Sequence, residues 1–236
     1  MSVFKRFAIF AAVFVTVSSM AMAQAPGRQL TVEESYLQMT IELMIIREQS
    51  RAPSRDMKLV ALEYIASVIE RGNQGEEIHA SLAFLGLEGI QNFTRENGRL
   101  VNNFPDVRLR AATQLGHLGT LEARDTLLTM LWAENDPMVI SEIIRGLGLI
   151  GNNDNDQAAI AISFIVSRFD VINPDNLMAF SALDAFERLA AAEGGIASPI
   201  MLTTIIRIAE GNYILPVRNR ARALLTDLRM LNVGRN

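Results

Sequence analysis

The chain has 236 residues, a formal net charge of −4 at pH 7 and no cysteine. Without cysteine it has no disulfide and no thiolate, which excludes cysteine-based catalysis and cysteine-containing zinc sites. The acidic balance argues against nucleic acid as a partner, because binding to a phosphate backbone needs clustered lysine and arginine.

The first 23 residues predict a secretory signal peptide. Lys5 and Arg6 form a short basic start, the apolar run 7–17 follows, and Ala21 and Ala23 supply small residues for cleavage after position 23. The apolar run is shorter than the roughly 20 residues that a transmembrane helix needs. We therefore expect an exported protein, periplasmic or secreted, with residues 24–30 as a flexible lead-in; an uncleaved anchor is the alternative.

From residue 31 onward the sequence predicts helices separated by short turns. Thr31 and Glu34 form a capping box. The helix that follows ends near Ser50, and we interpret it as an N-terminal capping helix over the first repeat. Its apolar stripe consists of Tyr36, Met39, Leu43 and Ile46. No stretch shows the alternation of apolar and polar residues that is typical of half-buried strands.

One spacing of small and apolar residues recurs five times along these helices. Its copies are Ala61/Ile65/Val68, Ala111/Leu115/Leu118, Ile143/Leu147/Ile150, Ala182/Phe186/Leu189 and Ala221/Leu225/Leu228. Prolines at 105, 137, 174 and 216 stand near helix starts, where a missing N–H costs nothing. Self-similarity of this kind predicts an all-α solenoid, in which each helical hairpin must stack on its neighbours to bury its apolar faces.

Residues 104–131, FPDVRLRAATQLGHLGTLEARDTLLTML, resemble a HEAT-like repeat of the short bacterial kind that also occurs in phycobilisome-lyase-type repeat proteins. Segments 135–151 and 215–228 match the same pattern more loosely. The resemblance covers about residues 52–236 and implies a single domain over 31–236: a right-handed α-solenoid of about five stacked hairpins. It implies little about activity, because such a scaffold hosts many functions.

Three features that imitate ligand sites are better explained by structure. The segment 146–151 spells G-x-G-x-x-G, but it ends a helix instead of joining a strand to a helix. The acidic segment 152–156 lacks the glycine and glutamate of an EF-hand loop, so we expect a turn that caps the next helix, with a weak calcium site as the alternative. His79 and His117 form no zinc motif, and His117 is expected on a helix surface. We predict no catalytic, cofactor or metal residues.

Partner binding is predicted where the repeat pattern is interrupted. Trp132 falls outside the inward positions of its helix, so we expect an exposed side chain at an interaction site; the alternative is that it fills a gap against the next hairpin. The insertion 92–104 offers Arg95, Arg99 and Phe104 for contact with a partner, and poor packing without a role is the alternative.

The C-terminal segment 216–236 has five arginines against Asp227, a local charge of +4. We expect Arg222 and Arg229 to dock an acidic partner or, peripherally, an anionic membrane surface; a polar cap on the last helix is the alternative. Arg108 and Arg218 share one repeat position, at which the resemblance implies an inter-repeat ladder. Because Ile140 interrupts that ladder, structural hydrogen bonding is the favoured interpretation for both.

Together these features predict a non-enzymatic, exported scaffold or accessory subunit of a cell-envelope assembly. We expect it to bind protein through the faces of the second helices and through the insertion. The alternatives are a carrier of a hydrophobic ligand or peptide, or a lyase- or isomerase-like HEAT-repeat enzyme subunit.

Overall fold

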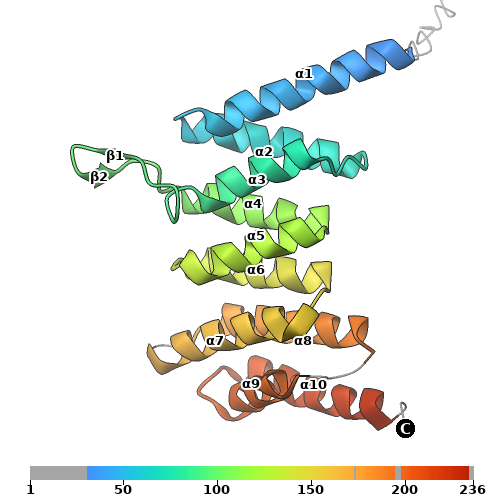
Figure 1. Cartoon of the computed structure of the whole chain (residues 1–236). Helices are drawn as coiled ribbons and strands as arrows, with labels where there is room; N and C mark the ends of the chain where they lie inside the picture. The colour runs from blue at the N-terminus through green and yellow to red at the C-terminus, as the bar shows by residue number, and fades with distance from the viewer. Residues whose placement is uncertain (1–30, 173, 195–197, 234–236) are drawn as a thin grey trace, which may run out of the picture. The chain divides into compact units, whose positions relative to one another are not determined.

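A computed structural model describes residues 31–172, 174–194 and 198–233 (Figure 1). The chain divides into two units, Met1–Met39 and Thr40–Asn236. The predicted signal peptide (1–23) and lead-in (24–30) lie outside the described residues. Within those residues, no helix combines the length and the apolar character needed to cross a membrane.

Most of the described residues are helical. They form α1 (Val32–Arg51), α2 (Arg55–Glu70), α3 (Glu76–Leu87), α4 (Pro105–Leu118), α5 (Leu121–Ala133), α6 (Pro137–Ile150), α7 (Gln157–Ile172), α8 (Asn176–Ala192), α9 (Pro199–Glu210) and α10 (Leu215–Val233). A short 3-10 helix, η1 (Asp154–Asp156), precedes α7. The prediction of an all-α chain is confirmed.

Within the second unit, the helices pair into hairpins that follow one another along the chain (Figure 1). The first helices of successive hairpins pack together from α2 through α4, α6 and α8 to α10, and the second helices α3, α5, α7 and α9 form a neighbouring layer. The described residues therefore hold four hairpins, with α1 before them and α10 after them, where the sequence suggested about five.

The five recurring triplets form the centre of the core. Nearly all their side chains are buried, and only Ile150 and Leu225 retain partial exposure. The packing explains the recurrence, because the first helices contact one another in sequence along the array, α2 with α4, α4 with α6, α6 with α8 and α8 with α10, and each contact needs the same apolar face. The repeat pattern thus predicted the buried face of α2, α4, α6, α8 and α10.

The glycines of the G-x-G-x-x-G segment serve helix packing and helix termination. A Cβ on Gly116 of α4 would lie 2.9 Å from the Gly146 Cα, and a Cβ on Gly148 would lie 2.6 Å from the Ala185 Cα of α8. Gly151 ends α6 with a left-handed φ of 71°, a conformation that favours glycine. The structural interpretation of this segment is confirmed.

The first helix buries only part of its predicted stripe. Ile46 belongs to the core and Leu43 packs against it, whereas Met39 is exposed. The side chain of Tyr36 lies outside the described residues. The expected end near Ser50 is one residue short of the observed end at Arg51.

The insertion contains a short β-hairpin that the sequence analysis did not predict. Strand β1 (Arg95–Glu96) pairs antiparallel with β2 (Arg99–Leu100), and the hairpin projects beside α3 and α4 (Figure 1). Asn97 and Gly98 both have positive φ values, 49° and 81°, as a two-residue hairpin turn requires. The Asn-Gly pair is the sequence signal that identifies such a turn.

Candidate functional site

An exposed aromatic pair lies on the layer of second helices. Trp132 near the end of α5 is 50% exposed and Phe164 of α7 is 52% exposed, and their ring centroids are 5.2 Å apart. Ile160, one turn before Phe164 on the same face of α7, is also exposed. We call Trp132, Ile160 and Phe164 the aromatic patch. The side chain of Trp132 is exposed, as expected, and its ring also contacts Phe164 of the next hairpin.

Polar contacts hold helix α7, which carries two of the three residues of the patch. Arg168 donates from Nη2 to the Glu134 carbonyl at 3.2 Å, just beyond the end of α5. Arg207 of α9 donates from Nη1 to the Ser167 hydroxyl at 2.5 Å. Because α7 is tied to the helices on either side, the patch is presented on a rigid surface, which suits a contact with another protein.

The insertion presents different side chains from those expected. Arg95 and Arg99 are exposed on the hairpin, and Arg95 donates to the Gly98 carbonyl at 3.2 Å. Phe104, at the N-cap of α4, is partly buried and packs against the core, so it is poorly placed for contact with a partner. The exposed aromatic of the insertion is instead Phe93, which is 58% exposed.

The base of the insertion is held by the buried side chain of Asn102. Its Nδ2 donates to the Asn92 carbonyl at 2.7 Å, and its Oδ1 accepts from the Thr94 amide at 2.9 Å. These bonds join the two ends of the insertion, while the tip with Arg95 and Arg99 extends into solvent. The insertion is therefore a projecting hairpin whose base is held by hydrogen bonds.

Only part of the positive charge of the C-terminal segment is available to a partner. Arg220 binds the carboxylates of Asp184 and Glu187 on α8. Arg222 and Arg229 are exposed, although Arg222 also donates from Nη2 to the Ala209 carbonyl at 3.3 Å. Arg235 lies outside the described residues. The docking surface predicted on α10 thus depends on Arg222 and Arg229.

Arg108 belongs to a buried ladder of charges along one edge of the hairpins. Its Nε donates to Glu134 at 2.6 Å and its Nη1 to the Glu88 carbonyl at 3.3 Å. Lys58, at the same repeat position in α2, binds the Glu88 carboxylate at 2.8 Å. The ladder therefore joins Lys58, Glu88, Arg108, Glu134 and Arg168. It confirms a structural role for Arg108.

Of the five residues in this ladder, only Arg108 was predicted from the sequence. Lys58 lies three residues before Ala61, as Arg108 lies three before Ala111, and both Glu88 and Glu134 directly follow a second helix. That shared register was the available signal. In α10 the matching Arg218 differs, because its Nε is buried without a hydrogen-bond partner among the described residues.

The acidic segment after α6 is a capping turn, as expected. Asn153 Oδ1 accepts from the Ala159 amide at 2.9 Å in the first turn of α7. The Asn152 Oδ1 and the Asp154 Oδ2 both accept from Arg124 Nη1, so these two oxygens are already paired with a guanidinium group. Among the described residues, no group of three His, Asp or Glu side chains is arranged to hold a metal ion.

The positions of the two histidines also fit a structural role. His117 is exposed on the surface of α4, as predicted. His79 of α3 lies 3.0 Å from the Thr126 hydroxyl of α5, measured from Nε2, and so joins two second helices.

Residues 99–167, which run from β2 into α7, match the family model of HEAT repeats. Over 121 residues, or 51% of this chain, the sequence is 31% identical to an uncharacterized protein of Treponema pallidum (strain Nichols). The aligned region makes up 22% of that protein, so the chain spans about a fifth of the length of the curated relative it matches. The match to α4–α7 supports a HEAT-like repeat protein, and HEAT repeats generally mediate contacts between proteins.

Proposed function

We propose that this chain is a non-enzymatic protein-interaction scaffold that binds its partner through the aromatic patch. The observation that carries the proposal is the exposed Trp132–Phe164 pair on rigid second helices inside the region that matches HEAT repeats. Tryptophan is among the residues most enriched at the energetic centres of protein interfaces. A half-exposed tryptophan in tilted contact with a half-exposed phenylalanine offers a large apolar contact area that is already ordered.

The setting that we propose is the cell envelope of a bacterium, with export directed by residues 1–23. The apolar run and the small residues that follow it support export. A right-handed superhelical path of the hairpins is part of the same proposal, because it would curve the second-helix layer into an extended binding face. Arg95, Arg99, Arg222 and Arg229 would then add charge contacts with an acidic partner at the edges of that face.

Trp132 provides the test, because it is the only tryptophan in the chain and its fluorescence therefore reports on the patch alone. A partner captured from envelope extracts by the wild-type protein should protect Trp132 from acrylamide quenching once the complex is purified. Trp132→Ala and Phe164→Ala should each weaken binding of that purified partner by about tenfold or more, as expected for residues at the centre of an interface.

Phe180→Ala is the matched control, because Phe180 is an exposed aromatic on the first-helix layer. It should leave the affinity unchanged. Equal losses from Phe164→Ala and Phe180→Ala, or unaltered quenching of Trp132 in the complex, would contradict the assignment of the patch as the interface.

The alternative of a carrier for a hydrophobic ligand receives no support from the two cavities described in the second unit. Their volumes are about 120 and 200 Å³, below the roughly 300–1,000 Å³ of typical ligand pockets. A cavity of that size holds one chemical group, not a lipid chain.

A further inference from the structure

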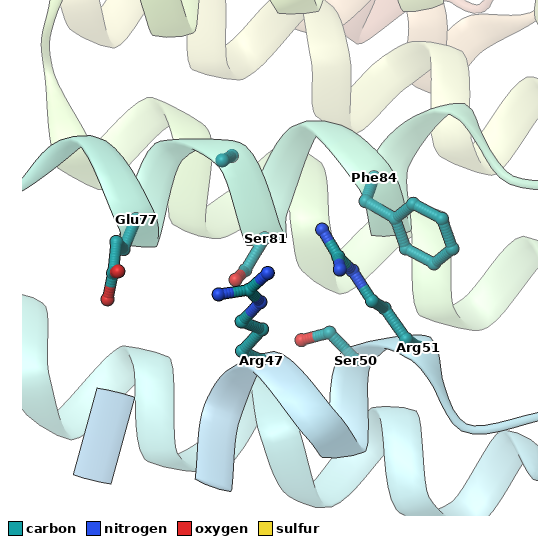
Figure 2. Close-up of a pocket in the computed structure, with 7 residues that line it drawn as sticks. Arg47, Ser50, Arg51, Glu77, Ser81 and Phe84 are labelled. Atoms are coloured by element: carbon teal, nitrogen blue, oxygen red, sulfur yellow. The ribbon is translucent and has the colours of Figure 1, made fainter. Parts of the chain in front are cut away.

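The smaller cavity, of about 120 Å³, lies between α1 and α3 in the second unit (Figure 2). The last two turns of α1 and the facing side of α3 form its walls. Its lining consists of Arg47, Ser50, Arg51, Glu77, Ala80, Ser81 and Phe84. None of these residues belongs to the aromatic patch or to the insertion, so the cavity is a separate feature of the molecule.

Two arginines supply the positive charge of this cavity. Arg47 and Arg51 are one helical turn apart, so their side chains lie on the same face of α1. Figure 2 shows both guanidinium groups extending from α1 toward α3, with Phe84 on the side of Arg51. Within the described part of the chain, neither guanidinium has an ion pair or a hydrogen-bond partner, although both are exposed to solvent at the mouth of the cavity.

Ser50 gives an independent indication that the cavity is built for a polar ligand. The residue is 1% exposed, and its hydroxyl has no hydrogen-bond partner among the described residues. A buried hydroxyl without a hydrogen-bond partner lowers the stability of the fold, and most buried hydroxyl groups in folded proteins have a partner. The Ser81 hydroxyl lines the same space. Together, the two hydroxyl groups and the two guanidinium groups offer hydrogen-bond donors around one small volume.

The other charged groups near the cavity either form an ion pair or lie at one end of the cavity. The Lys58 ammonium binds the Glu88 carboxylate at 2.8 Å and the Ser50 carbonyl at 3.1 Å, so it is not available to a ligand. Glu77 lines the other end of the cavity, beyond Arg47 in Figure 2. Among the residues that line the cavity, the carboxylate of Glu77 thus lies at the end away from Ser50 and Arg51.

We propose that this cavity binds a carboxylate carried on a short apolar stem. The guanidinium group can bind a carboxylate through two parallel hydrogen bonds. Two arginines therefore suit a carboxylate better than the compact ammonium group of a lysine would. Ala80, Phe84 and the aliphatic parts of the arginines provide an apolar wall for the stem. Such a group is found at the C-terminus of a polypeptide and in a free small carboxylic acid. The inference does not depend on the proposed scaffold function.

The test measures binding of four probes to the full chain by NMR, following the Nε–Hε signals of Arg47 and Arg51. The probes are propionate, inorganic phosphate, N-acetyl-Ala-Leu as the free acid, and the same dipeptide as its C-terminal amide. Propionate and the free acid should shift both signals and saturate. Binding of the free acid at least tenfold tighter than propionate identifies a polypeptide end as the source, and similar affinities identify a free acid.

Two results would overturn the proposal: binding of the amide as tight as that of the free acid, or phosphate binding as tight as that of propionate. Arg47→Ala and Arg51→Ala should each weaken propionate binding about tenfold, as the loss of a charge-assisted hydrogen bond predicts. Ser50→Ala should weaken it by a smaller factor, and Glu77→Gln should tighten it by removing a like charge.

Arg188→Ala is the control, because it removes the same charge from an exposed position on α8. It should leave the dissociation constant of propionate unchanged. An equal loss of affinity in Arg188→Ala and Arg51→Ala would show that net charge, not the cavity, determines binding.

Discussion

Arg108 is a charged side chain that the fold can bury only because several acceptors surround it. It is 2% exposed, and its guanidinium contacts the Glu134 carboxylate, the Glu88 carbonyl and the Asn103 side chain. Removing one partner of such a buried pair leaves the other charge without compensation, which is far more costly than losing a surface ion pair. Arg108 therefore links the residue that follows α3 to the residue that follows α5, and so connects two successive hairpins within the ladder.

We predict that Arg108→Met lowers the free energy of unfolding by about 3 kcal/mol, because Glu134 would stay buried without its cation. Urea denaturation followed by circular dichroism measures this change. Arg55→Met is the matched control, since Arg55 forms an exposed pair with Asp106, and it should cost less than about 1 kcal/mol.

The double variant Arg108→Met/Glu134→Met tests how much of the lost free energy of unfolding comes from leaving the Glu134 carboxylate buried without its cation. It should recover stability relative to Arg108→Met, because it removes the uncompensated carboxylate along with the cation. Equal losses from Arg108→Met and Arg55→Met would contradict the structural role that we assign to the ladder.

At the scale of elements, glycine sets the distance between the first helices. Gly148 of α6 lies against the backbone of Ala185 in α8, and Gly116 of α4 lies against Gly146. A glycine inside a helix lowers its stability by roughly 0.5–1 kcal/mol relative to alanine. That loss is offset here because the close approach of the two helices improves the packing of the neighbouring core residues.

We predict that Gly148→Ala destabilises the protein by about 1–2 kcal/mol despite the better helix propensity of alanine. The new Cβ would lie 2.6 Å from the Ala185 Cα, so the two helices would have to separate. The midpoint of thermal unfolding is the measurement.

Gly86→Ala is the control, because its Cβ would meet only the Met130 side chain, which can move. It should change stability by less than about 1 kcal/mol. A Gly148→Ala variant as stable as the wild type would show that α6 and α8 have room for a Cβ at position 148.

The helical elements were predictable from the sequence because their signals are local and repeated. Apolar spacing located the buried face of each first helix, and Pro105 and Pro137 marked the first residues of α4 and α6. The edge of the array was less predictable, because Lys58 and Glu88 are thirty residues apart and become partners only after the hairpin forms.

The insertion shows the same limit of local signals. Phe93 and Phe104 are both aromatic residues in a polar segment, and composition cannot distinguish them. The fold distinguishes them because Phe104 directly precedes α4 and packs against the core, whereas Phe93 lies between the two residues that bond to Asn102 and its side chain is exposed. Trp132 was easier to place, since its position relative to Leu127 and Leu131 on one helix fixed its direction.

At the scale of the whole molecule, an array of hairpins differs from a globular bundle in how stability is distributed. Each hairpin contributes its own stability and the energy of its interfaces with adjacent hairpins. In the second unit, α6 packs against α4, α5 and α8, whereas α10 packs against α8 and α9 alone among the described helices. The middle of the array should therefore open less often than α10.

We predict that hydrogen exchange measured by mass spectrometry shows the strongest amide protection in α4, α6 and α8. Protection should fall toward α10, because that helix has fewer neighbours to lose when it opens. It should be weakest at Asn97 and Gly98, which lie at the tip of a two-stranded hairpin with no covering layer. Gly148→Ala should lower protection in α6 and α8 more than in α2, since interface energies act between adjacent hairpins. Uniform protection from α2 to α10, falling equally in every helix when Gly148 is replaced, would instead identify one cooperative unit and contradict the additive array.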